Sequence, residues 1–286
     1  MILILSTNPN ISIWLFAVSR KNSPVKKKWS SMTEKITPVP EHQLVVPGRT
    51  KPYIMAHRGN KVLCPENTIA SFRQAIQDGA DILETDLHLS QDDVFMCIHD
   101  STLERTTNGV GTVNAKSLSE LKQLSASNGR PEFEQETIPT LAELAAILPA
   151  DVALALELKT DSFLDEKICR QLVEELTTLG IRNRTLVISF SKARTLAVHH
   201  LAPDIPAGLI TMSGLRPDAE MQIVGPFWPL LCANPFYMKT SRSRGQIVCP
   251  LDPTPDSRLN WYQRLRVDAI LTDNPQITCK LVKKYE

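Results

Sequence analysis

The chain has 286 residues, 42% of them hydrophobic, and a formal net charge of +1. This length suffices for one large domain or two small ones with a sizeable core, and the near-zero charge excludes a bulk attraction to nucleic acid or to an anionic membrane. The six cysteines are scattered without any C-x-x-C spacing, which argues against a zinc site or a dense disulfide framework.

Residues 1–50 differ in character from the rest of the chain. Two short apolar runs, MILIL and ISIWLFAV, are separated by polar residues and a proline, and neither is long enough to span a bilayer. The basic residues follow these runs, whereas a secretory signal has its positive charge first. The remainder up to residue 50 is polar and contains prolines. We therefore predict that residues 1–50 form a disordered or weakly ordered tail on a cytoplasmic protein, or that the first of them are not translated because Met32 is the start. A membrane-associating anchor is the other alternative.

From residue 51 onward, short β-rich runs alternate with amphipathic helical stretches. The first strand is predicted at 52–56. A helix with apolar residues at helical spacing follows it and ends at Gly79. The second strand, at 81–87, contains two acidic residues.

The third β-rich run, at 94–99, follows the second after a short polar link. A parallel crossover needs a dozen or more residues, so this run is predicted to return antiparallel to the second strand as a hairpin. The hairpin brings His99 back towards the rim on which His57 and Glu84 lie. The residues after it, about 101–140, are rich in Thr, Ser, Asn and Gly and are predicted to form a small insertion.

Further strands and helices alternate to the end of the chain. Asp161 or Ser162 is the predicted N-cap of a long helix that ends near Gly180. Eight parallel-type strands predict an α/β fold, a (β/α)₈ TIM barrel with a small insertion, over residues 51–286. The six strands after the hairpin are predicted at 152–157, 185–190, 207–211, 229–233, 246–249 and 268–272.

Acidic residues gather at the predicted strand ends. Side chains at i and i+2 of a strand share a face, so Glu84 and Asp86 project together and repel each other unless a cation or a proton lies between them. Taken alone, this pair fits a solvated strand rim, but Glu157 is a lone acid in an apolar run. Carboxylate ligands suit Mg²⁺ or Ca²⁺. With His57 and His99 nearby, the pattern suggests metal-assisted acid–base chemistry on a phosphate.

These stretches resemble the glycerophosphodiester phosphodiesterase family of TIM-barrel enzymes. Several motifs occur in order over most of residues 51–286, whereas one of them alone would be unspecific. The motifs are H-R-G at His57-Arg58-Gly59, P-E-N-T at Pro65 to Thr68, E-x-D at Glu84-Thr85-Asp86, H-D at His99-Asp100, L-x-R-T-T at Leu103 to Thr107, E-[IL]-K at Glu157-Leu158-Lys159, and D-x-x-x-T-D-x-P at Asp268 to Pro275.

The resemblance implies a role for the metal and for the two histidines. Glu84, Asp86 and Glu157 are expected to bind one divalent cation, Mg²⁺ or Ca²⁺. His57 and His99 are expected to act as general acid and base, one deprotonating the nucleophile and the other protonating the leaving alkoxide. The nucleophile is either a glycerol hydroxyl, which gives a cyclic phosphate that water opens, or water itself.

Two cationic residues lie beside these motifs. Arg58 and Lys159 are expected to hold the phosphate and to neutralise charge in the transition state; ordinary surface cations are the alternative. Asp273 is expected either to orient a catalytic histidine or to cap the last helix.

The remaining polar residues near the motifs are assigned supporting roles. Glu66 and Asn67 are expected to brace the loop after the first strand, and Arg105 to tie down the insertion by hydrogen bonds. His88 shares the strand face of Glu84 and Asp86 but has no motif counterpart, and we interpret it either as a bystander or as a residue that supports the site residues without acting itself.

One motif position departs from the family. Cys249-Pro250 stands where the family has a Trp-Thr pair whose aromatic ring helps to line the substrate mouth, so substrate preference does not follow from the resemblance. We expect hydrolysis of glycerophosphodiesters to sn-glycerol 3-phosphate and an alcohol, with lysophospholipid headgroup cleavage or a non-catalytic binding protein as alternatives. The expected partner is a small-molecule substrate, without nucleic acid or a transmembrane segment; the oligomeric state is left open.

Overall fold

The structure, a computed structural model, describes residue 46 and residues 48–283. The tail predicted over residues 1–50 falls almost wholly outside these described residues. Val46, which is described, is 2% exposed and packs in the apolar cluster inside the barrel. Among the described residues, no helix is long and apolar enough to cross a bilayer.

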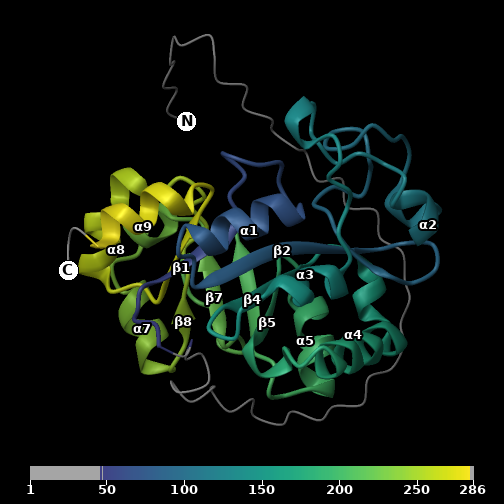
Figure 1. Cartoon of the computed structure of the whole chain (residues 1–286). Coiled ribbons are helices and arrows are strands. Elements are labelled where there is room, and N and C mark those ends of the chain that lie inside the picture. The colour runs from purple at the N-terminus through teal and green to yellow at the C-terminus, as the bar shows by residue number, and fades with distance from the viewer. Residues whose placement is uncertain (1–45, 47, 284–286) are drawn as a thin grey trace, which may run out of the picture. The chain divides into compact units, whose positions relative to one another are not determined.

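Eight parallel strands form one sheet in the order β8-β7-β6-β5-β4-β2-β1-β9. The two ends of this order meet, because Asp268 N donates a hydrogen bond to Val248 O at 2.9 Å. The sheet is therefore a nearly closed barrel with the helices around it (Figure 1), which confirms the predicted TIM barrel. The strands are β1 (Tyr53–His57), β2 (Ile82–Leu89), β4 (Ala153–Leu158), β5 (Thr185–Ser189), β6 (Ala207–Thr211), β7 (Ile223–Pro226), β8 (Ile247–Val248) and β9 (Ala269–Thr272).

Each strand is buried on both faces, as expected for a parallel sheet between helices and a packed barrel interior. Alternate residues of β2 separate the two faces: Ile82 packs inside the barrel, whereas Leu83 and Leu87 pack against the surrounding helices. The described helices are α1 (Ile69–Gln77), α2 (Leu118–Leu121), α3 (Leu141–Ile147), α4 (Glu166–Thr178), α5 (Lys192–Leu201), α6 (Pro229–Ala233), α7 (Tyr237–Ser243), α8 (Leu259–Leu265) and α9 (Pro275–Lys283).

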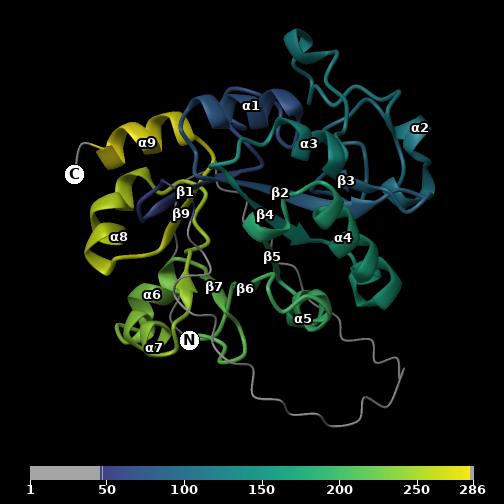
Figure 2. The ribbon, with the colours of Figure 1, turned by 60° about the horizontal axis from the view of Figure 1, so that its bottom comes forward.

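The predicted hairpin is confirmed. Strand β3 (Phe95–Cys97) pairs antiparallel with β2. The chain then forms the excursion around α2, which lies on the opposite side of the barrel from α8 and α9 (Figures 1 and 2). This excursion has an apolar cluster of its own, formed by Met96, Ile98, Leu103, Val113, Leu121, Ala126 and Ile138.

Two sequence predictions were wrong. Residues 229–233 form helix α6 rather than a strand, with Pro229 at its first turn, where proline is favoured; the strand is β7, which ends at Pro226. The N-cap of the long helix α4 is Asp165, whose side chain accepts from Lys167 N, and not Asp161 or Ser162. A short 3-10 helix, Asp161–Leu164, precedes it.

Candidate active site

The loop between β1 and α1 has a constrained backbone. Arg58 and Asn67 have positive φ angles of 58° and 55°, which are costly for residues with a Cβ. Between them, Gly59 has a φ of 79°, and a Cβ there would lie 2.5 Å from Ser71 Oγ. The backbone N–H of Arg58 donates to Glu84 Oε2 at 2.9 Å. The loop is therefore held against α1 on one side and β2 on the other.

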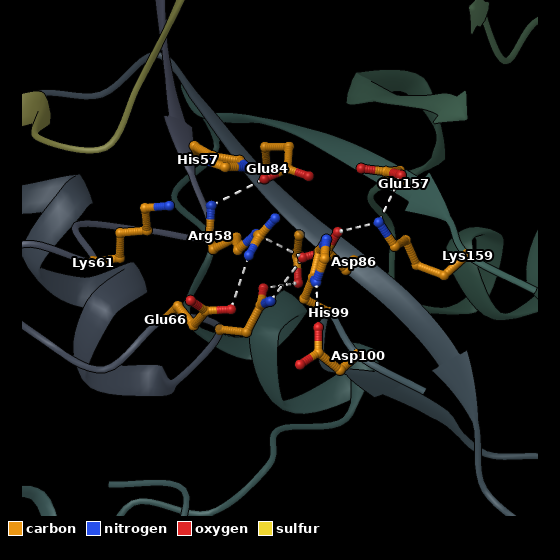
Figure 3. A network of polar contacts seen from close by, with 12 residues as sticks. His57, Arg58, Lys61, Glu66, Glu84, Asp86, His99, Asp100, Glu157 and Lys159 are labelled. Carbon is orange, nitrogen blue, oxygen red and sulfur yellow. Dashed lines mark hydrogen bonds and ion pairs between the residues drawn. The ribbon is translucent and has the colours of Figure 1, made fainter. Parts of the chain in front are cut away.

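Three carboxylates meet at the carboxyl ends of two neighbouring strands. Glu84 and Asp86 project from β2 and Glu157 from β4, and Asp86 pairs with Glu157 in the parallel register. Their side chains are buried, and one oxygen of each lies within 4.8 Å of the others. Figure 3 shows the three side chains directed towards one another across the strands. The alternation of β2 and the register with β4 thus build one acidic cluster.

Two cations and an amide contact this cluster. Arg58 Nε lies 3.1 Å from Asp86 Oδ2, which also accepts from Asn67 Nδ2 at 2.9 Å. Lys159 Nζ donates to Glu157 Oε1 at 2.8 Å and lies 3.4 Å from Asp86 Oδ1. Within the described residues, Asp86 Oδ1 is buried without a hydrogen-bond partner. Three carboxylates therefore face two cationic side chains, and Asp86 Oδ1, although near the Lys159 ammonium, accepts no hydrogen bond.

The pKa values of the three carboxyl groups are shifted in different directions. Burial, and next the charges of Asp86 and Glu157, raise the pKa of Glu84 well above its ordinary value. Burial also raises the pKa of Glu157. Burial opposes ionisation of Asp86 as well, but Arg58 and Lys159 lower its pKa to about 2. Close carboxylates cannot all ionise without a compensating charge, so the cluster lacks positive charge in the absence of a bound cation.

His57 ends β1 and is anchored by Asp273, which directly follows β9. Its Nδ1 lies 2.7 Å from Asp273 Oδ1, and Asp273 Oδ2 lies 3.0 Å from Lys61 Nζ. Burial lowers the pKa of His57, and the bond to Asp273 opposes that shift. Of the two roles expected for Asp273, the structure therefore shows the contact with the histidine. This contact occupies Nδ1 and leaves Nε2 as the nitrogen available for proton transfer.

His99, just beyond β3, is held in a similar way. Its Nδ1 lies 2.6 Å from Asp100 Oδ1, and its carbonyl oxygen lies 3.1 Å from His88 Nε2. Burial lowers the pKa of His99. Hydrogen bonds from Arg105 foremost lower the pKa of Asp100 to about 2. Of the two roles expected for His88, the structure therefore shows the supporting one, because His88 contacts the backbone of His99.

All seven residues predicted for the site lie on the rim at the carboxyl ends of the first strands. The three acidic residues form one cluster, which Arg58 and Lys159 contact. Sequence reasoning did not assign roles to Lys61 and Asp100. For Asp100, its position directly after His99 was a usable signal, whereas Lys61 carried no local signal because its partner, Asp273, is remote in sequence.

Comparison with known proteins finds relatives that match most of this chain. The sequence profile of the "Glycerophosphoryl diester phosphodiesterase family" matches residues 57–277. A glycerophosphodiester phosphodiesterase of Caldanaerobacter subterraneus subsp. tengcongensis is 31% identical over 82% of this chain and 99% of its own length. A glycerophosphodiester phosphodiesterase of Bacillus altitudinis is 30% identical over 80% of this chain and 97% of its own.

Solved structures lead to the same family. An Oleispira antarctica phosphodiesterase, solved with the product sn-glycerol-3-phosphate, is 29% identical and has a TM-score of 0.71; the match covers 81% of this chain and 97% of the other. A glycerophosphodiester phosphodiesterase from Agrobacterium tumefaciens is 26% identical, with a TM-score of 0.70 over 80% and 99% of the two chains. On the profile match and the identity to whole relatives, this chain belongs to the glycerophosphoryl diester phosphodiesterase family of enzymes.

Proposed function

We propose that this protein hydrolyses glycerophosphodiesters to sn-glycerol 3-phosphate and an alcohol, with one bound divalent cation and two histidines. The observation that carries the proposal is the cluster of Glu84, Asp86 and Glu157 on a rim that also bears His57 and His99. The product complex of the Oleispira antarctica relative supports the product. The family membership and the names of the relatives favour this activity over lysophospholipid headgroup cleavage.

The residues of the acidic cluster fit a hard divalent cation. All three donors are carboxylates, the ligand type that Mg²⁺ and Ca²⁺ prefer, and Asp86 Oδ1 is a buried oxygen without a hydrogen-bond donor. A bound cation would supply the missing positive charge, polarise a phosphoryl oxygen and help orient the substrate. Glu84, Asp86 and Glu157 would hold it. The activity assay with each metal distinguishes Mg²⁺ from Ca²⁺.

The two histidines are prepared for proton transfer. Each has its Nδ1 against a carboxylate, Asp273 for His57 and Asp100 for His99. This arrangement fixes the ring and stabilises the imidazolium that forms when Nε2 takes up a proton. One histidine deprotonates the attacking hydroxyl, of water or of the glycerol, and the other protonates the leaving alkoxide. If the glycerol hydroxyl attacks, water then opens the cyclic phosphate to give sn-glycerol 3-phosphate.

Arg58 and Lys159 are the groups proposed to bind the phosphate. The Arg58 guanidinium lies between Glu66 and Asp86 (Figure 3), and Lys159 lies between Asp86 and Glu157. Fixed cations of this kind neutralise negative charge that builds up in the transition state without reorganising at the moment of reaction.

Release of glycerol phosphate from glycerophosphocholine tests the proposal. The full chain should be active with Mg²⁺ or Ca²⁺ and inactive in chelator, and His57→Ala and His99→Ala should each lower kcat by about 10²–10⁴-fold. Lysophosphatidylcholine serves as the comparison substrate and should turn over more slowly. Full activity in chelator, or in either histidine variant, would contradict the mechanism.

A further inference from the structure

Arg105 joins the two sides of the candidate site from within the insertion. Its guanidinium donates to both oxygens of Asp100, at 2.6 and 3.2 Å, and to both oxygens of Glu66, at 3.0 and 2.8 Å. Asp100 is the carboxylate on His99, and Glu66 accepts from Arg58 Nη1 at 2.9 Å. One side chain thus connects the partner of a histidine with the partner of a phosphate-binding cation.

We infer that Arg105 is a positioning residue that fixes the side chains of His99 and Arg58 relative to each other. The inference rests on the proposed function for its catalytic meaning. Arg105 approaches neither the acidic cluster nor His57 in any described contact, so its effect passes through Asp100 and Glu66. Both carboxylates are bound bidentately, which fixes their planes as well as their distance from the guanidinium. A shift in either plane would move a hydrogen bond to His99 or to Arg58.

The chemistry of the linkage requires arginine. A guanidinium offers five N–H donors in a rigid fork, whereas a lysine ammonium is a point charge on a flexible stem. Asp100 binds the Nε and Nη2 edge of the guanidinium, and Glu66 binds its Nη1 and Nη2 edge. We therefore expect Arg105→Lys to keep the charge and to lose the positioning.

A second arginine of the insertion provides the matched control. Arg130 donates to the carbonyl oxygens of Lys61 and Val62 in the loop between β1 and α1. It therefore also ties the insertion to that loop, but among the described contacts it reaches neither Asp100 nor Glu66. If Arg105 only anchored the insertion, Arg130→Ala would have a comparable effect.

The experiment compares Arg105→Ala, Arg105→Lys and Arg130→Ala in the full chain. With glycerophosphocholine, kcat should fall about 10–100-fold in both Arg105 variants, as for other groups that orient a catalytic ligand. Arg130→Ala should keep the wild-type kcat. Millimolar guanidinium should restore part of the kcat of Arg105→Ala. A double-mutant cycle with Asp100→Asn should be non-additive, because the two changes break one chain of contacts.

The outcomes separate this inference from the proposed function. Absence of wild-type turnover would refute the proposed function, and the positioning role would then be read from ¹⁵N shifts of His99. Wild type and Arg130→Ala should show one tautomer with the proton on Nδ1, and Arg105→Ala a mixture. Equal losses in Arg105→Ala and Arg130→Ala, recovery in Arg105→Lys, or an unchanged His99 tautomer would overturn the inference.

Discussion

Two carboxylates on the rim of the barrel are equally buried and have opposite surroundings. Glu84 on β2 and Asp252, which follows β8, are both 2% exposed. The Glu84 side chain accepts one backbone N–H, from Arg58, and lies against two other acids. Asp252 accepts from Arg258 at 2.6 and 2.7 Å and from Tyr262 Oη at 2.6 Å.

The same contrast extends to the two halves of the rim. After β1, β2, β3 and β4 the polar side chains converge and leave a surplus of negative charge. After β5 and β8, the charged side chains form ion pairs with one another. Lys192, for example, pairs with Asp218 and Glu220. Burial of a charged group does not by itself mark a site; a buried acid that its neighbours fail to satisfy does.

The largest effect is expected from Glu84→Gln. Turnover should fall to background, because a cation ligand is lost. Without metal, however, the variant should melt at a higher temperature than wild type at mildly alkaline pH. The folded-state pKa of Glu84 is raised above its unfolded-state value, so the stability of wild type declines as pH rises towards that pKa. The substitution removes this decline. Activity assays and thermal melts with and without chelator check both expectations.

Asp252→Asn is the control for that prediction. It should lose about 1.5–3 kcal/mol of stability, because charge-assisted hydrogen bonds are broken, while kcat stays at the wild-type value. If Glu84→Gln were the less stable variant in chelator, or if Asp252→Asn abolished turnover, the contrast between the two halves would be wrong.

A smaller effect is expected from Gly59→Ala. The new Cβ would lie 2.6 Å from the backbone carbon of Ser71 as well as 2.5 Å from its Oγ, and Ser71 is completely buried. The loop must move, at a cost of about 1–3 kcal/mol for the strained backbone alone, and Arg58 moves with it. Chemical denaturation and kcat should both register the change.

Gly180→Ala separates the backbone cost from the clash. Gly180 also has a positive φ, 69°, but a Cβ there meets nothing within 4 Å. This variant should lose stability without losing activity. Equal stability losses in Gly59→Ala and Gly180→Ala would show that the contact with Ser71 is unimportant.

Substitutions of Asp273 and of Lys61 should shift one limb of the pH–rate profile in opposite directions. The contact with Asp273 raises the pKa of His57 and the charge of Lys61 lowers it. Asp273→Asn should therefore move the limb that His57 controls to lower pH, by on the order of one unit, whichever proton transfer His57 performs. Lys61→Met should move it to higher pH. Profiles of kcat/KM for the two variants check the signs, and shifts in the same direction would exclude His57 as the group observed.

Much of the fold was predictable because the strands are continuous apolar runs. The strand predicted at 207–211 matches β6 residue for residue. The error at 229–233 has a physical cause: PLLCA is apolar in any conformation, and periodicity cannot separate a short buried helix from a strand. The neighbouring β7, Ile223–Pro226, contains a glycine and a proline, which conceal it as a strand.

The candidate site was predictable where chain geometry is local. Alternation along β2 places Glu84 and Asp86 on one face, and adjacency of β4 supplies Glu157. Contacts between distant segments were not predictable. Lys61 meets Asp273 across more than 200 residues of sequence, and Arg105 reaches Glu66 only because the insertion folds back on the loop between β1 and α1.

The smallest effect is expected from Lys192→Ala, with Lys159→Ala as its counterpart. Both lysines follow neighbouring strands, β5 and β4, and both bind two carboxylates. The Lys192 side chain is 32% exposed and its partners are on the next loop, so its loss should cost about 0.2–1 kcal/mol of stability and leave kcat unchanged. Lys159→Ala should lower kcat, since its partners belong to the acidic cluster. Kinetics and chemical denaturation of the two variants, measured in parallel, test both expectations. A loss of kcat in Lys192→Ala would show that the functional rim extends into the half of the barrel that we regard as structural.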